Sequence, residues 1–291
     1  MMQAGVIAPE FCADFYRQTQ ADLRDFTEDQ LADHYREHGK NEGRCASPAD
    51  FRDGFIAQIN HCRSILEIGP AVRPTLSGSN VQYFDIADRA GLIARACREN
   101  YDISRCPNFI DYVSPEGDLG VVDVKFDAIF SSHCVEHQPD LIRHLHQVAS
   151  ILNPGGCYYL MIPDKRYCFD NLLPASDIKR IRRAHQEQRK THIFESILEH
   201  VALTTHNSAN RHWEKDHVDL HMVQNQAERI IKAREMFEQA NGGYIDVHAW
   251  QFTPDSFRDI IEGLSGIISL RVNRVYNTLR NTNEFGAVLC L

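Results

Sequence analysis

The chain has 291 residues, of which 43% are hydrophobic and 24% charged, and its formal net charge is −9. This length fits one large domain with additions or two small ones, and no apolar run approaches the about 18 to 20 residues of a membrane helix. The acidic balance argues against a broad nucleic-acid footprint. Nine cysteines without a C-x-x-C pair predict reduced thiols in a cytoplasmic protein. Residues 1–5 lack the basic region of a signal peptide.

Short helices are predicted over residues from about 8 to 48, and we treat residues 1–50 as an N-terminal helical extension. Leu31 and Tyr35 would share one helix face, and Gly39 is a natural helix stop. The pattern H-Y-x-x-H-G-x-x-E-G-R at 34–44 resembles a short helical module found on bacterial surface-glycan enzymes. A helical pair that only packs on the main domain explains the pattern equally well.

The central stretch of the chain is S-I-L-E-I-G-P at 64–70, which predicts a buried strand that stops at Glu67 and Gly69. A second short strand at 81–85 also ends on a carboxylate, Asp85. Because ligands bind at the carboxyl ends of strands in open α/β sheets, both carboxylates are expected to face one crevice. An acid at the end of the second strand suits the two hydroxyls of a ribose.

The loop after Gly69 excludes one class of nucleoside cofactor. A dinucleotide fingerprint requires G-x-G-x-x-G, so that the backbone can approach a pyrophosphate. Residues 70–74 read P-A-V-R-P and contain no further glycine. A cofactor with a ribose but no phosphates, such as S-adenosylmethionine, does not need that cradle.

Strand and helix patterns alternate from residue 51 to 164, which predicts a parallel sheet. Further strands are expected at 109–113, 126–132 and 157–162, and helices at 87–100 and 141–152. Residues 165–245 are polar and mostly helical, and seven of the fifteen histidines lie within 185–221, so we predict an insertion over the carboxyl edge of the sheet. Thr253 is a plausible N-cap before Pro254. The two last extended runs, 267–276 and 284–291, require an antiparallel hairpin.

Four sequence pieces, in this order, resemble the class I S-adenosylmethionine-dependent methyltransferases. They are L-E-I-G at 66–69, F-D at 84–85, F-D at 126–127 with V-E-H-Q-P-D at 135–140, and L-N-P-G-G at 152–156. The resemblance covers about 51–164 and 252–291. It implies an α/β fold, with a Rossmann-like seven-stranded mostly parallel sheet, a terminal antiparallel hairpin and a helical insertion at about 165–245. The methyltransferase domain would span 51–291.

The resemblance also implies the residues around the cofactor, S-adenosylmethionine. Asp85 would accept the ribose hydroxyls, and His133 would lie close to the methyl group. Most family members have a second glycine where this chain has Ala71. The other residues implied for the methionine, ribose, adenine and methyl sides are Glu67, Gly69, Pro70, Asp111 and Ser132.

The run I-P-D-K-R-Y-C-F-D at 162–170 resembles a subgroup encoded with, or fused to, glycosyltransferases. It implies a saccharide hydroxyl as the acceptor, in a surface polysaccharide or its precursor, and a glycosyltransferase as partner. A neutral hydroxyl requires a base, and His133, His137 and Asp164 are candidates at the expected strand ends. A structural role for His137 and a capping role for Asp164 are the alternatives.

The insertion offers candidates for binding a saccharide or another small acceptor. Trp213 supplies an aromatic face for a sugar ring and its neighbours supply hydrogen-bond donors, although an ordinary buried tryptophan is equally consistent. The other substrate-binding candidates are Arg211, His212 and His217.

Two other functions stay open. A catalytically inactive methyltransferase-like module would bind glycan or assemble with a glycosyltransferase. A metal-dependent hydrolase would instead use insertion residues as ligands, but their spacing matches no established metal motif, so no metal site is predicted. The residues that this hydrolase would use are His206, His212, His217, His221, Asp216 and Asp219.

Overall fold

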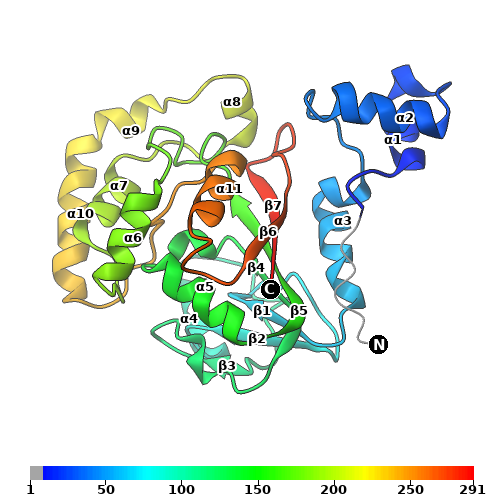
Figure 1. The fold of residues 1–291 in the computed structure, drawn as a ribbon. Coiled ribbons are helices and arrows are strands. Elements are labelled where there is room, and N and C mark those ends of the chain that lie inside the picture. The colour runs from blue at the N-terminus through cyan, green and yellow to red at the C-terminus, as the bar shows by residue number, and fades with distance from the viewer. Residues whose placement is uncertain (1–8) are drawn as a thin grey trace. The chain divides into compact units, whose positions relative to one another are not determined.

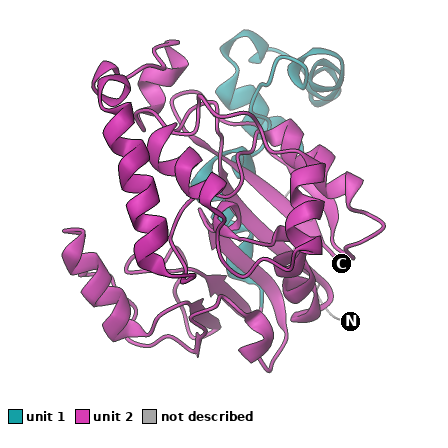
Figure 2. Ribbon diagram, turned by 90° about the vertical axis from the view of Figure 1, so that its left-hand side faces the viewer, with its two compact units in different colours: residues 1–62 teal, residues 63–291 magenta. Residues whose placement is uncertain are grey.

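The structure, a computed structural model, describes residues 9–291, so the prediction about residues 1–5 lies outside the described part. The chain divides into two compact units, residues 1–62 and 63–291 (Figure 2). The first unit thus includes twelve residues beyond the extension expected at 1–50. Within the described residues, no helix combines the length and apolar character that crossing a bilayer requires.

The first unit is a small helical body. Tyr16 is fully buried and packs with Leu23 and Leu31. The second helix begins at a reciprocal cap, in which Thr27 and Gln30 each accept a hydrogen bond from the other's backbone. The helices are α1 (Ala13–Thr19), α2 (Glu28–His34) and α3 (Arg52–Ala57), with shorter helical turns at Ala21–Leu23, Tyr35–Gly39, Pro48–Asp50 and Ile59–His61.

Gly39 ends a helical stretch as predicted, but for a different physical reason. It does not adopt the left-handed conformation that usually selects glycine at helix ends. Instead, a Cβ at this position would clash with the hydroxyl oxygen of Tyr16. Five residues later, Arg44 binds both carboxylate oxygens of Asp22 at 2.9 and 2.7 Å. These residues of the H-Y-x-x-H-G-x-x-E-G-R pattern therefore maintain the internal packing of this unit.

The second unit is built on a seven-stranded sheet of order β3-β2-β1-β4-β5-β7-β6 (Figure 1). All neighbouring strands are parallel except β7, which runs antiparallel to β5 and β6. The predicted α/β fold with a terminal antiparallel hairpin is therefore confirmed. The strands are β1 (Ile65–Ile68), β2 (Val81–Asp85), β3 (Tyr112–Val113), β4 (Phe126–Ser132), β5 (Leu152–Pro163), β6 (Arg271–Val275) and β7 (Glu284–Cys290).

The starts of three strands differ from the expected ones, and β6 begins at Arg271, four residues after the expected residue 267. The third strand contains only two residues, because the preceding Ile110 packs with helix α4 instead of extending the ladder. The fifth strand begins at Leu152, five residues early, because the N-P-G-G turn is absorbed into it. The register between β4 and β5 shifts at that point.

The helices of this unit begin and end near the expected positions. Thr253 caps α11 reciprocally with Ser256, and Pro254 occupies the first turn, as predicted. Within the insertion, α7 and α10 lie side by side around Ile197 and Ala233 (Figure 1). The helices are α4 (Arg89–Arg98), α5 (Leu141–Ser150), α6 (Ile178–Gln186), α7 (Phe194–Ala202), α8 (Ala209–Trp213), α9 (Leu220–Gln224), α10 (Gln226–Ala240) and α11 (Pro254–Gly263).

Two of the nine cysteines form a disulfide. Cys157 and Cys290 lie directly opposite each other on β5 and β7, with their Cα atoms 4.2 Å apart. The expectation that all cysteines are reduced thiols is therefore wrong for this pair. The sequence positions are 133 residues apart, so only the strand pairing brings them together.

His144 on α5 is a buried histidine within the core of the second unit. Its Nε2 lies 3.0 Å from the hydroxyl of Tyr158, which also bonds the hydroxyl of Ser131 at 2.7 Å. Burial, with a smaller contribution from Arg143, lowers the pKa of His144 to about 4. The folded protein therefore holds this ring uncharged at neutral pH.

Because of His144, we expect part of the free energy of unfolding to be lost at acidic pH. The folded pKa of this histidine lies below the ordinary value of 6.5, so only the unfolded chain binds a proton as the pH falls from 6.5 towards 4. From pH 7 to pH 5 this residue should reduce the free energy of unfolding by about 2 kcal/mol. His144→Gln should lose that share, which denaturant unfolding at both pH values measures. Parallel pH profiles for the two proteins would contradict this prediction.

Candidate active site

A pocket of about 310 Å³ lies at the carboxyl ends of β1 and β2. Gly69, directly after β1, has a φ of +72°, a left-handed conformation that glycine adopts without strain. Gly69 and Asp85, two of the predicted cofactor residues, line this pocket together. Its lining residues are Ile68, Gly69, Phe84, Asp85, Ile86, Gly117, Leu119, Cys134, Gln138 and His144.

The carboxylate of Asp85 is held rigidly at the end of β2. It accepts hydrogen bonds from the backbone N–H of Ala71 at 3.0 Å and of Ile86 at 2.7 Å. Burial raises the pKa of Asp85, and these N–H groups act against that rise. Each carboxylate oxygen has a second lone pair. The side chain therefore offers a fixed acceptor to a diol such as a ribose.

Glu67 and Asp111, also predicted to line the cofactor, hold the backbone. The Glu67 carboxylate accepts hydrogen bonds from the N–H groups of Thr75 at 2.8 Å and Leu76 at 2.9 Å. Asp111 precedes β3 and accepts from the N–H of Tyr83 at 2.8 Å, inside the sheet and not at its carboxyl edge. These bonds position the loop after β1 and the strand β2, and contact of Glu67 and Asp111 with the cofactor stays a prediction.

Pro70 and Ser132, two further predicted cofactor residues, lie at the carboxyl edge of the sheet but do not line the pocket. Pro70 is buried in the turn between Gly69 and Ala71, and its carbonyl accepts a hydrogen bond from the N–H of Arg73. Ser132 is the last residue of β4. Their contact with the cofactor stays a prediction.

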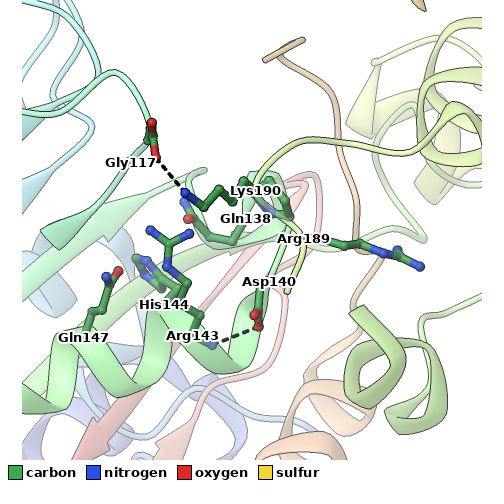
Figure 3. A pocket seen from close by; sticks show the side chains of 10 residues that line it. Gly117, Gln138, Asp140, Arg143, His144, Gln147, Arg189 and Lys190 are labelled. Carbon is green, nitrogen blue, oxygen red and sulfur yellow. Dashed lines mark hydrogen bonds and ion pairs between the residues drawn. The ribbon is translucent and has the colours of Figure 1, made fainter. Parts of the chain in front are cut away.

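A second pocket, of about 250 Å³, adjoins the first (Figure 3). Gly117, Gln138 and His144 line both pockets. The second is bordered by the cations Arg143, Arg189 and Lys190, and Lys190 Nζ lies 3.5 Å from Glu116 Oε2. The binding surface at the first pocket thus continues past the start of α5.

His133, the predicted base, directly follows β4 and lies next to Cys134 of the pocket wall. Its φ is +50°, a conformation that is strained for a residue with a Cβ and that clusters at functional sites. Its N–H donates to Met161 O, and its Nε2 lies 2.8 Å from Glu284 Oε2 at the start of β7. Strand pairing and the glutamate thus fix this imidazole at the carboxyl edge.

Asp164, the second predicted base, is fully buried, and both of its carboxylate oxygens accept hydrogen bonds. Its carboxylate lies 2.6 Å from Arg166 Nη2 and accepts a hydrogen bond from Thr278 Oγ1 at 2.6 Å. It also accepts from the backbone N–H of Arg166. These bonds make Asp164 an anchor of the turn after β5, which agrees with the capping role named as its alternative, and its role as a base stays a prediction.

His137, the third candidate, lies beside two carboxylates. Its Nδ1 is 2.8 Å from Asp246 Oδ1 and its Nε2 is 3.8 Å from Glu136 Oε1. Burial disfavours the charged ring, but the two carboxylates outweigh it and raise the pKa of His137. Because its pKa is raised, this ring keeps its proton over more of the neutral pH range and is less available to accept one, so His133 is the better candidate.

The predicted acceptor residues divide into two groups. His212 is buried, with its Nε2 3.0 Å from His206 O and its Nδ1 3.0 Å from His217 Nδ1. Arg211 pairs with Asp216 at 2.7 Å. These side chains bind one another within the insertion, and their predicted contact with an acceptor stays a prediction.

Trp213 lies at the sheet edge. Its indole stacks on Tyr167 with ring centroids 3.9 Å apart, and its Nε1 donates to Thr282 O at 2.9 Å. Thr282 precedes Glu284, the partner of His133, by two residues. One short segment therefore contacts both the aromatic pair and the predicted base.

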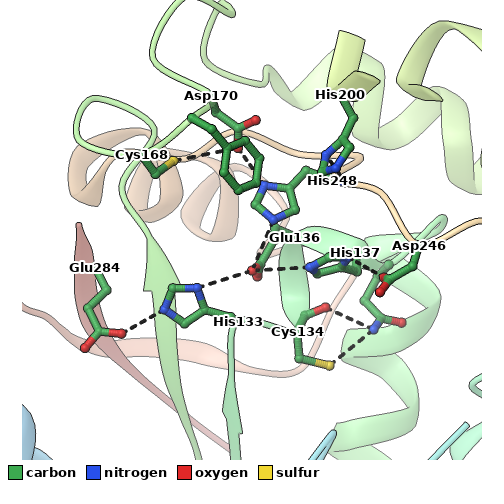
Figure 4. A network of polar contacts seen from close by, with 12 residues as sticks. His133, Cys134, Glu136, His137, Cys168, Asp170, His200, Asp246, His248 and Glu284 are labelled. Atoms are coloured by element: carbon green, nitrogen blue, oxygen red, sulfur yellow. Dashed lines mark hydrogen bonds and ion pairs between the residues drawn. The ribbon is translucent and has the colours of Figure 1, made fainter. Parts of the chain in front are cut away.

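A buried polar cluster, which the sequence did not predict, lies on the other side of His133 (Figure 4). It joins the turn Val135–His137 after β4, Asp170 after β5, His200 on α7, and the stretch before α11. Its members are Glu136, His137, Asp170, His200, Asp246 and His248. Only the E-H pair at 136–137 and the last residue of the 162–170 run lie in motifs that the sequence singled out.

Burial shifts the ionisation of this cluster. It lowers the pKa of His248 to about 3 and that of His200 to about 4. It raises the pKa of Asp170 to about 7, although the neighbouring His200, His137 and Lys165 act in the opposite direction. The cluster therefore contains the uncharged imidazoles of His200 and His248. Beside them lies the carboxyl group of Asp170, whose negative charge the neighbouring cations do not fully balance.

The sequence of the chain, like its site, is typical of a known family. It matches the family described as "Methyltransferase domain" over residues 17–262. The chain belongs to this methyltransferase family. The match confirms the prediction of an S-adenosylmethionine-dependent methyltransferase.

The pocket of the methyltransferase fits its cofactor. Asp85 would supply a buried acceptor for the ribose hydroxyls, and Gly69 leaves the backbone without a Cβ at the carboxyl end of β1. Cys134 and Gln138 complete the wall towards His133. The residues that would hold S-adenosylmethionine are therefore those around the 310 Å³ pocket.

The methyltransferase is also similar to solved structures. The DhpI–SAM–HEP complex is 14% identical, with 96% of this chain and 94% of that chain covered and a TM-score of 0.39. The CcbJ methyltransferase from Streptomyces caelestis is 11% identical, covering 81% and 91%, with a TM-score of 0.38. An S-adenosylmethionine-dependent methyltransferase from Clostridium acetobutylicum is 14% identical, with a TM-score of 0.29; 51% of this chain but only 62% of that chain is covered. No curated protein matches the sequence.

Proposed function

We propose that this methyltransferase methylates a hydroxyl group of a saccharide, in a surface polysaccharide or its precursor. The proposal rests on the contacts of the segment 282–284, which binds both Trp213 and His133. Its Thr282 carbonyl accepts a hydrogen bond from Trp213, and its Glu284 carboxylate bonds His133. A base for a hydroxyl and an aromatic surface for a sugar ring are thus attached to one short piece of chain.

The chemistry requires a positioned base. S-adenosylmethionine, when bound, supplies a methyl group activated by a sulfonium. Glu284, as an ionised carboxylate, only accepts hydrogen bonds, so it places the imidazole proton of His133 on Nε2 and leaves Nδ1 as the accepting nitrogen. His133 Nδ1 would then take the proton of the acceptor hydroxyl as its oxygen attacks in line.

The test is an incubation of the full chain with methyl-labelled cofactor and a panel of nucleotide sugars, oligosaccharides and small phenols. We expect label on saccharides, and the proposal is overturned if label appears only on phenols. Cofactor binding without transfer to any acceptor would instead favour the inactive glycan-binding module. The hydrolase alternative has lost its support, because His206, His212 and His217 bind one another or the backbone.

The aromatic pair predicts a separation of acceptor and cofactor binding. Trp213→Ala should raise the acceptor KM severalfold, because the stacking surface is lost. Cofactor affinity should stay nearly unchanged, since Trp213 lies on α8 and does not line the pocket formed by Gly69 and Asp85. Trp213→Phe, which keeps an aromatic ring on Tyr167, is the matched control and should retain most of the acceptor affinity. Equal loss of both ligands, measured by calorimetry and steady-state kinetics, would indicate a folding role.

A glycosyltransferase partner and a cytoplasmic location extend this proposal. The resemblance of the 162–170 run to glycosyltransferase-associated enzymes supports the partner. The location has weaker support, because the disulfide between Cys157 and Cys290 is uncommon in a reducing compartment.

A further inference from the structure

Three histidines surround one carboxylate at the carboxyl edge of β4. Oε1 of Glu136 lies 3.8 Å from His137 Nε2, 3.8 Å from His248 Nε2 and 4.0 Å from His133 Nδ1. Figure 4 shows the three rings converging on this oxygen. These side chains come from two segments more than a hundred residues apart, so the fold assembles the group.

Each of these histidines is held from behind by another carboxylate. His133 Nε2 lies 2.8 Å from Glu284, His137 Nδ1 lies 2.8 Å from Asp246, and His248 Nδ1 lies 2.6 Å from Asp170. At His133 and His248 the carboxylate forms a hydrogen bond to the outer nitrogen, which places the proton there and turns the other nitrogen inward. At His137 the contact with Asp246 is an ion pair without a hydrogen bond. A carboxylate on the outer nitrogen is the usual support of histidine ligands in metal sites.

Glu136 supplies an independent indication of a ligand. Its side chain is fully buried, and neither carboxylate oxygen has a hydrogen-bond partner among the described residues. A buried carboxylate without a hydrogen bond or a close cation is costly. The nearest imidazole nitrogens, at 3.8 Å, are too far away for a hydrogen bond, so a bound cation or a donor from a ligand would satisfy this carboxylate.

We propose that Glu136, His137 and His248 bind a divalent first-row transition-metal ion. Their ligand atoms lie within 4.8 Å of one another, whereas ligands of a tetrahedral zinc lie about 3.4 Å apart, so a small side-chain contraction closes the site. Two imidazoles and one carboxylate suit Zn²⁺ and similar ions and leave a coordination position for a further oxygen. Asp170 and Asp246 are the outer supports.

The ion would lie beside His133, whose Nδ1 faces the same oxygen of Glu136. A hydroxyl bound to the ion would have a lowered pKa and would lie near the base. This catalytic use rests on the proposed function, whereas metal binding itself does not. Methylation by a metal-free enzyme would overturn the metal role alone, and metal binding without methylation would leave only the proposed function in doubt.

A second group, Asp170, His200 and His248, also has its ligand atoms close together and shares His248. The two groups of ligands predict different effects of substitutions on metal binding. If the site is the first group, Glu136→Gln should weaken binding at least about a hundredfold, and Asp170→Asn, an outer support, by about 10- to 100-fold. His200→Gln, which keeps an acceptor for the backbone N–H of His248, separates the two groups and should bind the metal as the wild type does.

The experiment uses the full chain, stripped with a chelator and dialysed, and titrated with Zn²⁺ in a calorimeter. We expect one equivalent to bind and the thermal unfolding midpoint to rise with Zn²⁺. Circular dichroism checks that each variant is folded, and Asp170→Asn provides the test if Glu136→Gln is not. No binding, or equal binding by Glu136→Gln and the wild type, would overturn the site. Loss of binding in His200→Gln would overturn this set of ligands in favour of the second group.

Discussion

Replacing His133 by alanine is expected to lower kcat by about a hundredfold or more, the usual consequence of losing one general base. The ring is fixed by Glu284 at 2.8 Å and by the backbone bond to Met161, so its removal takes away a positioned proton acceptor. Cofactor affinity should hardly change, because the ring is not part of the pocket that contains Asp85. Single-turnover kinetics with a saturating acceptor measures the effect.

A matched pair of variants separates the base from its support. Glu284→Gln keeps the shape of the support but not its charge, so kcat should fall less than in His133→Ala. Added imidazole should partly restore His133→Ala, since a small base can occupy the vacated space, and should not restore Glu284→Gln. An alanine variant that keeps the wild-type kcat would show that the base lies elsewhere.

The sheet could be predicted because its signals are local. Residues 126–132 form an apolar-rich stretch that ends in two serines, and β4 has these bounds. The hairpin followed from the short connection between the last two extended runs. The start of β5 was missed because N-P-G-G reads as a turn, whereas the structure includes it in the strand.

Site residues were predictable only where a strand end decides their place. Asp85 and Gly69 both end up in the pocket, but Glu67, also near a strand end, faces the backbone at Thr75 and Leu76. The path of the following loop decides between these outcomes, and sequence position does not reveal it. The polar cluster was missed for the same reason. His248 reaches Glu136 through the chain's tertiary path, and no spacing between them is diagnostic.

The abundance of histidines in the insertion was misleading. His212 and His217 satisfy each other at 3.0 Å, whereas His248, outside the predicted insertion, lies in the cluster beside the base. Tertiary neighbours, which the sequence does not list, decide whether a histidine is structural or available to a ligand.

Replacing Asp85 by alanine should weaken the binding of S-adenosylmethionine by about 1.5 to 3 kcal/mol, the range for hydrogen bonds to a charged group. In affinity this is roughly a 10- to 150-fold loss. The fold should survive, because the side chain lies at the end of β2 and not among the large apolar residues of the core. Calorimetric titration with the cofactor, together with a thermal unfolding scan, measures both quantities.

Asp85 also holds the N–H of Ala71, so part of the loss could come from the loop after Gly69. Asp85→Asn keeps one acceptor oxygen for that N–H and is expected to bind the cofactor better than the alanine variant. Asp88→Asn is the matched control: it removes a carboxylate only three residues away, while asparagine still caps α4 at Gly91. Its cofactor affinity should equal that of the wild type. If Asp88→Asn and Asp85→Ala weaken binding equally, general electrostatics would explain the loss and the ribose assignment would fail; unchanged affinity in Asp85→Ala would remove the assignment directly.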